Sequence, residues 1–337
     1  MRLMSRPTES KDFGACFKLM NDSFLYECER DRTHLFEMWR ALLANGSGLS
    51  GVIEDLDCCP QPRLVGFGFA VFLTDKFVDE AISSPKPYIS HEVLQRSLCR
   101  RSPVLSYAEI EKRNSEGAKG VNWLGLHTGW EETGLTPLQC EAMRKYMLGQ
   151  LLENISGYKL RSFLKEIYSR KECEVFQELG ANVLNNYGDF ATCSCHPERQ
   201  VRLVGLLRGG DSAPANEGRV FQGLFNYTPP RIHFTSRQRE ILGLAMRGWT
   251  DNEIALIMQR NGVRIMPRTV TAHLTKALER AQGLPGIFPE EPKASVSNRK
   301  TSTKAEVRGT GRRHLLFNYL RQHPEELRPH RGNGKTQ

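Results

Sequence analysis

Residues 234–284 read FTSRQREILGLAMRGWTDNEIALIMQRNGVRIMPRTVTAHLTKALERAQGL and carry the densest local signals in the chain. Thr235 with Gln238, and Thr250 with Glu253, each match a capping box. In that device the threonine oxygen accepts from a backbone N–H in the first helical turn, and the longer side chain reaches back to the cap residue. Both pairs precede runs with helical apolar spacing. The stretch therefore predicts short helices packed closely together, which is typical of a small tri-helical DNA-binding domain.

The third predicted helix begins at Pro267, because proline suits a first helical position whose N–H would have no partner. Its apolar residues fall on one stripe that must pack on the other two helices: Val270, Leu274, Ala277, Leu278 and Ala281. The side chains on the opposite face are short, polar or cationic, which are the kinds of side chain that can contact bases in a major groove. The predicted DNA-contacting residues of this helix are Arg268, Thr269, Thr271, Ala272, Thr275 and Lys276. The predicted phosphate contacts are Arg237, Arg239, Arg247, Arg260 and Arg264.

Three blocks in order, T-x-R-Q-R-E-I-L, G-W-T-D-N-E-I-A and P-R-T-V-T-A-H-L, resemble the LuxR/FixJ-type helix-turn-helix of transcriptional regulators. The resemblance implies a four-helix domain whose third helix enters the major groove and whose fourth helix serves dimerisation, so a homodimer is expected. It places Thr271, Ala272 and Thr275 toward the groove. The sequence departs from the family in a longer turn, QRNGVR at 259–264, and in Met266, which replaces the usual small hydroxyl cap.

Length and charge divide the chain. Its 337 residues suit two domains better than one. Residues 231–337 hold 20 Lys or Arg against 9 Asp or Glu, whereas residues 1–230 hold 27 against 29, so the basic end is the candidate for contact with a polyanion. The predicted divisions are an α/β sensor or acetyltransferase-like domain at 1–207, a Gly- and Pro-rich linker at 208–231, the helix-turn-helix domain at 232–284, and a basic, largely disordered tail at 285–337 with a helix over 312–323.

Cysteine usage and hydropathy indicate a cytoplasmic protein without membrane contact. The nine cysteines are odd in number and lack the spacing of a disulfide framework, and no secretory signal opens the chain. The longest apolar run, VGFGFAVFL at 65–73, is too short to cross a bilayer. Cys193, Cys195 and His196 form a C-x-C-H without a second ligand pair, which is more often incidental than metal-binding. No metal or cofactor is therefore expected.

Residues 1–207 alternate helical and strand patterns. The predicted order is helices within 12–27 and 35–43, a hairpin of 49–56 with 63–73, a helix over 90–100, a strand at 121–130, a helix over 136–152, a strand at 158–168, a helix over 170–179, and strands at 180–187 and 201–207. This order, with F-Q-E-L-G-A before a strand, resembles the Gcn5-related N-acetyltransferase fold. The predicted fold class is an α+β domain, with an acetyltransferase-like mixed sheet and flanking helices, followed by an all-α helix-turn-helix domain.

The activity of the first domain has three interpretations. The resemblance implies a Gly-rich loop that binds the coenzyme A pyrophosphate, but the corresponding loop at 127–139 lacks the usual basic and glycine pattern and carries Glu131 and Glu132, which would repel a phosphate. The main expectation is therefore a non-enzymatic domain that senses a ligand or dimerises, in a regulator that binds double-stranded DNA. The alternative is an acetyl-coenzyme A-dependent N-acetyltransferase fused to a DNA-binding module. In a third, an autoinducer-type pocket for a small-molecule effector is lined by Trp123 and Trp130, although such a pair more often belongs to a core.

Overall fold

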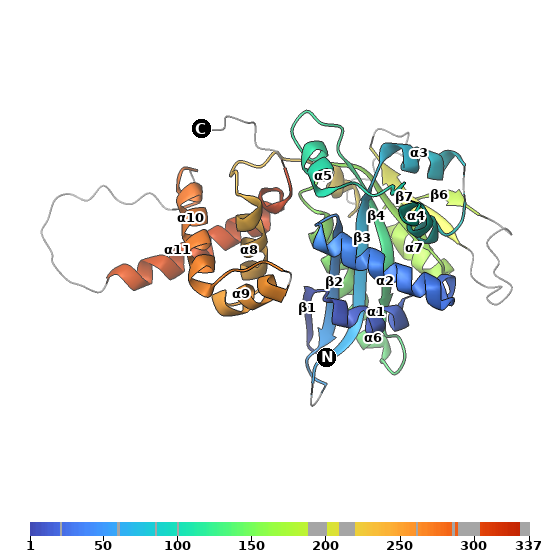
Figure 1. Ribbon diagram of the computed structural model, residues 1–337, viewed down its shortest axis with the longest axis horizontal. Helices are drawn as coiled ribbons and strands as arrows, with labels where there is room; N and C mark the ends of the chain where they lie inside the picture. Colours follow the sequence, from blue (N-terminus) through green and yellow to red (C-terminus); the bar gives the residue numbers. More distant parts are fainter. Residues whose placement is uncertain are drawn as a thin grey trace, which may run out of the picture. The chain divides into compact units, whose positions relative to one another are not determined.

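The computed structural model describes residues 1–20, 22–58, 61–84, 86–99, 101–187, 201–208, 220–260, 262–284, 287–288 and 304–330. The chain divides into two compact units, Met1–Tyr227 and Thr228–Gln337 (Figure 1). Among the helices of the described residues, none combines the length and apolar character needed to cross a membrane.

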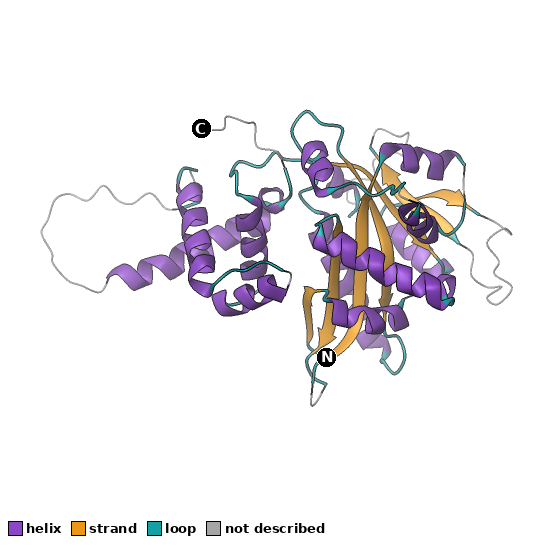
Figure 2. Ribbon diagram, in the orientation of Figure 1, coloured by secondary structure: helices purple, strands orange, loops and turns teal. Residues whose placement is uncertain are grey.

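The first unit is built on one mixed sheet (Figure 2). The strands are β1 (Leu3–Pro7), β2 (Gly48–Asp55), β3 (Arg63–Leu73), β4 (Val121–Trp130), β5 (Leu160–Ile167), β6 (Asn182–Asn186) and β7 (Arg202–Leu207). They are ordered β1-β2-β3-β4-β5-β7-β6. Neighbours pair antiparallel except β4 and β5, which run parallel. The predicted mixed sheet with flanking helices is confirmed for this unit.

Helices cover both faces of the sheet because β3 is apolar on both sides. Phe67, Phe69 and Val71 pack with α1 (Phe13–Leu19) and α2 (Glu29–Ala44), which Figure 1 shows running across the sheet. Ala70 and Phe72 alternate with them and lie in the core of the other face. That face is covered by α6 (Pro137–Ile155) and α7 (Arg170–Glu178). Three further helices follow β3 and precede β4 in the sequence: α3 (Asp75–Ser83), α4 (Ile89–Leu98) and α5 (Tyr107–Arg113).

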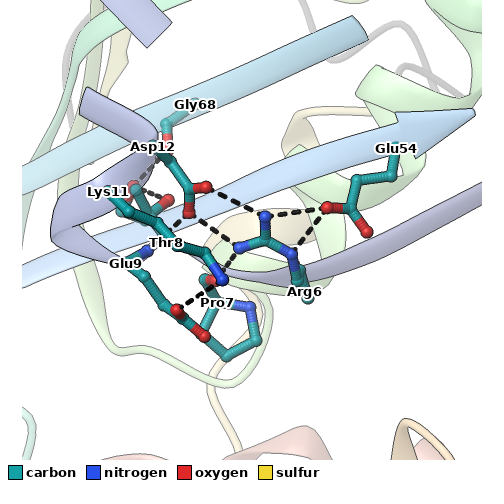
Figure 3. A network of polar contacts seen from close by, with 9 residues as sticks. Arg6, Pro7, Thr8, Glu9, Lys11, Asp12, Glu54 and Gly68 are labelled. Atoms are coloured by element: carbon teal, nitrogen blue, oxygen red, sulfur yellow. Dashed lines mark hydrogen bonds and ion pairs between the residues drawn. The ribbon is translucent and has the colours of Figure 1, made fainter. Parts of the chain in front are cut away.

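Strand β1 was not expected from the sequence, and an ion-pair network explains it (Figure 3). The Arg6 guanidinium donates to Asp12 Oδ2 at 2.7 Å and Oδ1 at 2.9 Å, and its Nε donates to Glu54 Oε1 on β2 at 2.8 Å. Burial alone would raise the pKa of Asp12, but the hydrogen bonds from Arg6 and from the Glu9 N–H hold that pKa below its ordinary value. The network thereby fixes β1 beside β2, where residues LMSRP show no apolar alternation.

The chain after α1 lies directly against the end of β4. Met20 forms an isolated antiparallel bridge with Gly129. A Cβ atom built on Gly129 would lie 1.8 Å from the Leu19 carbonyl oxygen. Any residue other than glycine would therefore clash there unless the backbone moved. Glycine at this position therefore allows the segment that follows α1 to approach the sheet.

In the second unit, α8 (Ser236–Met246), α9 (Asp251–Arg260) and α10 (Pro267–Gln282) occupy the stretch over which three helices were predicted. Both capping boxes form: Gln238 N donates to Thr235 Oγ1 at 3.2 Å, and Glu253 N donates to Thr250 Oγ1 at 3.4 Å. The first residue before α10, Met266, makes no side-chain cap.

Part of the predicted disordered tail belongs to the core of this unit. Residues 304–327 form α11 (Lys304–Gln322) and a 3₁₀ turn, η5 (Pro324–Leu327). Leu316 and Leu320 of α11 are buried against the other three helices. Glu326, fully buried, accepts from the Arg231 N–H at 2.9 Å and the Ile232 N–H at 2.7 Å, so it satisfies the backbone that leads into α8. The segments 289–303 and 331–337 lie outside the described residues.

The predicted linker over 208–231 is also shorter than expected. Phe221 and Leu224, in the 3₁₀ turn η4 (Gln222–Phe225) and just before it, are buried in the core of the first unit. Residues 209–219 lie outside the described part of the chain. Burial of the apolar side chains in VFQGLF therefore places this segment in the first unit, although the glycine and proline around it are typical of a linker.

We expect Gly129→Ala to destabilise the first unit by about 1–3 kcal/mol or more, because the added methyl group overlaps the Leu19 carbonyl oxygen. Calorimetry of the full chain measures the change. Gly149→Ala is the matched control, since Gly149 is an exposed residue of α6 with open space at its Cβ, and the change should be neutral or stabilising. Equal melting of the two variants would contradict the close approach.

Candidate active site

A cleft of about 750 Å³ lies between the sheet of the first unit and helices α6 and α7. Its floor is made of small residues on adjacent strands: Gly51 of β2 pairs with Gly68 of β3, and Ala70 of β3 pairs with Gly125 of β4. The absence of side chains at Gly51 and Gly68, where an added Cβ would meet nothing closer than 3.5 Å, leaves space that a packed sheet face would fill. The walls are largely apolar and include Trp123, Trp130, Met147, Leu148, Leu151, Phe163 and Phe176.

Strands β4 and β5 part at the floor of this cleft. Their parallel pairs run from Val121↔Leu160 to Gly125↔Lys165, after which β4 continues to Trp130 without pairing to β5. A bulge accompanies the parting, because Phe69 pairs with His127 while Ala70 pairs with Gly125, which leaves Leu126 as an extra residue. Bulges re-aim the chain and are common beside active sites. The β5-facing edge of β4 is therefore outside the β4–β5 ladder from Leu126 onward, until Met20 bridges Gly129.

Lys165 stands where the two strands part. It is 5% exposed, lines the cleft, and its Nζ donates to Thr128 Oγ1 of β4 at 2.9 Å. Its aliphatic stem lies against Gly125, where an added Cβ would be 2.9 Å from Lys165 Cδ. Glycine at 125 thus lets the lysine extend across the gap between the strands.

Tyr168, between β5 and α7, lines the cleft and joins it to a buried polar cluster. Its hydroxyl donates to Glu166 Oε2 at 2.7 Å and lies 3.4 Å from Asp22 Oδ2. Asp22 also accepts from Ser90 Oγ at 2.8 Å, and His127 Nδ1 is 3.1 Å from Asp22 Oδ2. The cluster brings together residues from four separated segments of the chain.

Burial sets the proton affinities of this cluster. It raises the pKa of Glu166 to about 7, although hydrogen bonds from Tyr168 and from the N–H groups of Ile89 and Tyr88 work in the opposite direction. Burial would also raise the pKa of Asp22, but the adjacent His127 holds it below its ordinary value. The Tyr88 N–H donates to Glu166 Oε1 at 2.6 Å with Tyr88 in the left-handed region, at φ 67°. A tyrosine in that region is strained, and the carboxylate contact holds it there.

The rim of the cleft carries both signs of charge. Glu132, in the loop after β4, lines the cleft, and Glu131 Oε1 accepts from the Thr133 N–H at 3.2 Å. Both carboxylates stand in the loop that the resemblance compares with a phosphate-binding loop, and weak phosphate binding there stays a prediction. Exposed cations stand elsewhere on the rim, at Arg144 and Lys145 of α6 and at Lys171 of α7.

The predicted DNA-contacting residues gather on one helix of the second unit. The exposed ones are Arg268, Thr269, Thr271, Ala272, Thr275 and Lys276 on α10, and Arg264 in the turn before it. Thr271 Oγ1 donates to Asp251 Oδ2, which ties α10 to the start of α9. Arg237 is partly buried and forms an ion pair with Glu240 at 2.7 Å.

The prediction that Arg239 contacts phosphate is wrong, because the residue is buried. It is 7% exposed, and its guanidinium lies 3.3 Å from His330 Nδ1 in the interior of the second unit. The Arg260 side chain lies outside the described part of the structure. The cations available for phosphate contact are therefore fewer than the sequence suggested.

The extended turn at 259–264 is held at both ends. The Val263 N–H donates to the Met258 carbonyl oxygen at 2.9 Å, and Gln259 Nε2 donates to the Ile265 carbonyl oxygen at 2.8 Å. Gly262 adopts φ 81°, which a residue with a side chain rarely does. These contacts hold Val263 and Ile265 against the end of α9.

Three residues of the site were not predicted from the sequence: Lys165, Glu166 and Tyr168. Their signal is a Lys-Glu pair between apolar residues of β5, in FLKEI at 163–167, a pattern that a buried strand tolerates only with partners. Trp123 and Trp130, by contrast, do line the cleft. The C-x-C-H at 193–196 lies outside the described residues, within which no cluster of potential metal ligands occurs.

Comparisons with known proteins give structural neighbours alone: no family model and no curated protein matches the chain. The C-terminal condensation domain of Ebony, in complex with beta-alanyl-dopamine, is 15% identical, with a TM-score of 0.38, covering 61% of this chain and 99% of that chain. A variant of the spermidine N-acetyltransferase SpeG from Vibrio cholerae is 13% identical, at 0.35, covering 61% and 93%. A putative arylalkylamine N-acetyltransferase from the yellow fever mosquito is 12% identical, at 0.34, covering 61% and 87%.

The expectation that this chain is not an enzyme is corrected by these comparisons. The neighbouring structures are named as spermidine, arylalkylamine and agmatine N-acetyltransferases or as a condensation domain. No helix-turn-helix regulator is among these neighbours.

Replacing Glu166 by Gln should flatten the pH dependence of stability. Because the native pKa of Glu166, about 7, exceeds its ordinary value of 4.5, the native state binds more protons than the unfolded state between those values. Glu166 therefore contributes stability at low pH that is lost as pH rises toward about 7. Relative to Glu166→Gln, the wild type should lose free energy of unfolding between about pH 5 and about pH 8.

Urea unfolding followed by tryptophan fluorescence measures this difference, since three of the four tryptophans, Trp39, Trp123 and Trp130, lie in the first unit. Parallel pH profiles for the wild type and Glu166→Gln would show that the carboxyl group does not titrate differently on folding.

Proposed function

We propose that residues 1–227 form an N-acyltransferase that moves an acyl group from a coenzyme A thioester to an amine. The observation that carries the proposal is the parting of β4 and β5 beneath a largely apolar cleft, beside Tyr168. A strand edge that leaves the ladder can pair with an extended ligand, and a cleft of this kind suits a thin, amide-bearing chain.

The residues of the cleft fit the parts of such a donor unequally. The β5-facing edge of β4 between Gly125 and the Met20–Gly129 bridge suits the amide groups of the pantetheine arm, and the apolar walls suit its methylene groups. The loop with Glu131 and Glu132 does not suit the phosphates. Arg144, Lys145 and Lys171 are the rim cations that can meet them.

The reaction joins the amine nitrogen to the thioester carbonyl carbon and breaks the bond from carbon to sulfur. The products are an amide and a thiol, so the proton that leaves the amine is balanced by the proton gained by the sulfur. In this proposal the Tyr168 hydroxyl, which donates to Glu166 Oε2 at 2.7 Å, must turn from that carboxylate toward the thioester in the cleft. Burial and the charges of Glu166 and Asp22 raise the pKa of Tyr168 well above its ordinary value, so it keeps its proton and acts as a hydrogen-bond donor.

Tyr168→Phe should lower turnover by about a hundredfold or more with little change in the Kd for acetyl-coenzyme A, because it removes a donor that acts in the transition state. Thiol release with a panel of polyamines and arylalkylamines measures turnover, and a thermal-shift titration measures binding. Tyr146→Phe is the matched control, on α6 but outside the lining of the cleft.

Two outcomes count against this proposal in different ways. Full turnover by Tyr168→Phe would remove the role given to the hydroxyl. Absence of saturable stabilisation by acetyl-coenzyme A in the wild type would contradict acyl transfer itself.

For the second unit we propose DNA binding by a helix-turn-helix in which α10 reads the major groove. The observation that favours it is the exposed face of α10, where short side chains stand between Arg268 and Lys276. Val270, Leu274 and Ala277 on the opposite face are buried, so that face of α10 is not available to DNA. In this proposal Arg264 contacts phosphate and Arg237 must first leave Glu240. A homodimer and a small-molecule effector stay predictions.

Arg268→Ala and Lys276→Ala should each weaken binding to duplex DNA by about 1–3 kcal/mol where the side chain reads a base. A side chain that contacts phosphate should instead lower the slope of log K against log salt by about one. Fluorescence anisotropy with a labelled mixed-sequence duplex at several salt concentrations measures the slope, and selected sequences measure discrimination. Lys119→Ala, an exposed lysine of the first unit, is the matched control for charge loss. Binding by both α10 variants equal to that of Lys119→Ala would exclude α10 as the reading helix.

A further inference from the structure

Lys165 is a cation in an enclosed, mostly apolar setting. Its residue is 5% exposed, and its neighbours at the floor of the cleft include Gly125, Trp123 and Phe163. An ammonium group has three N–H donors, and Thr128 Oγ1 takes one of them at 2.9 Å. Taking such a group out of water is costly unless its charge and its donors are matched.

The acidic groups that the structure describes near Lys165 do not form an ion pair with its ammonium group. Within the described residues no carboxylate lies at ion-pair distance from Lys165 Nζ. Asp22 and Glu172 interact with it electrostatically from farther away. Asp22 is engaged by Ser90 and His127, and burial raises the pKa of Glu172, which favours its uncharged form.

We propose that Lys165 binds a carboxylate carried by a substrate of the acyl transfer, an inference that rests on the function proposed above. Lys165 sits at the point where β4 and β5 part, which is where that function brings donor and acceptor together. A carboxylate there gains a charge-assisted hydrogen bond in a site shielded from water. Thr128 orients the ammonium group beside it.

Two sources can supply the carboxylate, and matched probes separate them. For the donor, succinyl-coenzyme A and butyryl-coenzyme A have acyl chains of similar length, and succinyl alone bears a carboxylate. For the acceptor, tyrosine and tyramine, each with acetyl-coenzyme A, differ by the carboxylate of the amino acid. We expect the wild type to favour the carboxylate-bearing member of one pair by about tenfold or more, as kcat/KM or Kd.

Lys165→Met should abolish that preference, because it lowers the binding or use of the carboxylate-bearing member of the pair to that of its uncharged counterpart. Circular dichroism and thermal melting report whether the Lys165→Met variant is folded. Lys165→Arg should retain part of the preference because it keeps the charge. Lys119→Met, at an exposed site away from the cleft, should behave as the wild type. If Lys165→Met binds no probe, the circular dichroism and preference of Lys165→Arg decide the question.

The proposal is overturned if the wild type shows no carboxylate preference in either pair, or if Lys165→Met keeps the preference in full. Binding and turnover of butyryl-coenzyme A without such a preference would leave acyl transfer standing and remove the carboxylate site alone. Failure of every thioester to bind the wild type would instead remove the proposed function, and the carboxylate site with it.

Discussion

The end of the parallel pairing between β4 and β5, at Gly125 and Lys165, is the constraint on which the rest of the first unit depends. Two strands that diverge leave backbone groups without ladder partners and a gap that side chains must fill or line. Lys165 crosses the gap on one face, and the segment after α1 approaches Gly129 at the end of β4. The buried carboxylates of Asp22 and Glu166 share one donor, the hydroxyl of Tyr168, which follows β5.

Much of this fold was predictable because its signals are local. The alternation of β3, the capping pairs Thr136–Gln139 and Thr235–Gln238, and the apolar stripe of α10 each lie within one short segment. Strand β1 escaped prediction because its cause is remote: Arg6 needs Glu54, 48 residues away, before residues 3–7 have a reason to be extended. Phe221 and Leu224 were hidden in a stretch whose composition is that of a linker, although burial of their side chains decides its place.

The candidate site was less predictable than the fold for the same reason. The sequence directed attention to the loop with Glu131 and Glu132, and its acidic character pointed away from catalysis. The groups that now matter meet only in space, since Tyr168 and Asp22 are 146 residues apart. The adjacent lysine and glutamate in a strand indicated that polar partners must exist, but the sequence did not identify those partners. On α10 the exposed face followed from helical periodicity, whereas the burial of Arg239 depended on His330.

Glu326 has a consequence for the order in which the second unit can form. The N–H groups of Arg231 and Ile232 find their acceptor more than ninety residues later in the chain, and α11 adds Leu316 and Leu320 to a core begun by α8. During synthesis, α8, α9 and α10 therefore leave the ribosome before the residues that complete their packing. Until then the apolar stripe of this helical trio is open to chaperones and to other nascent chains.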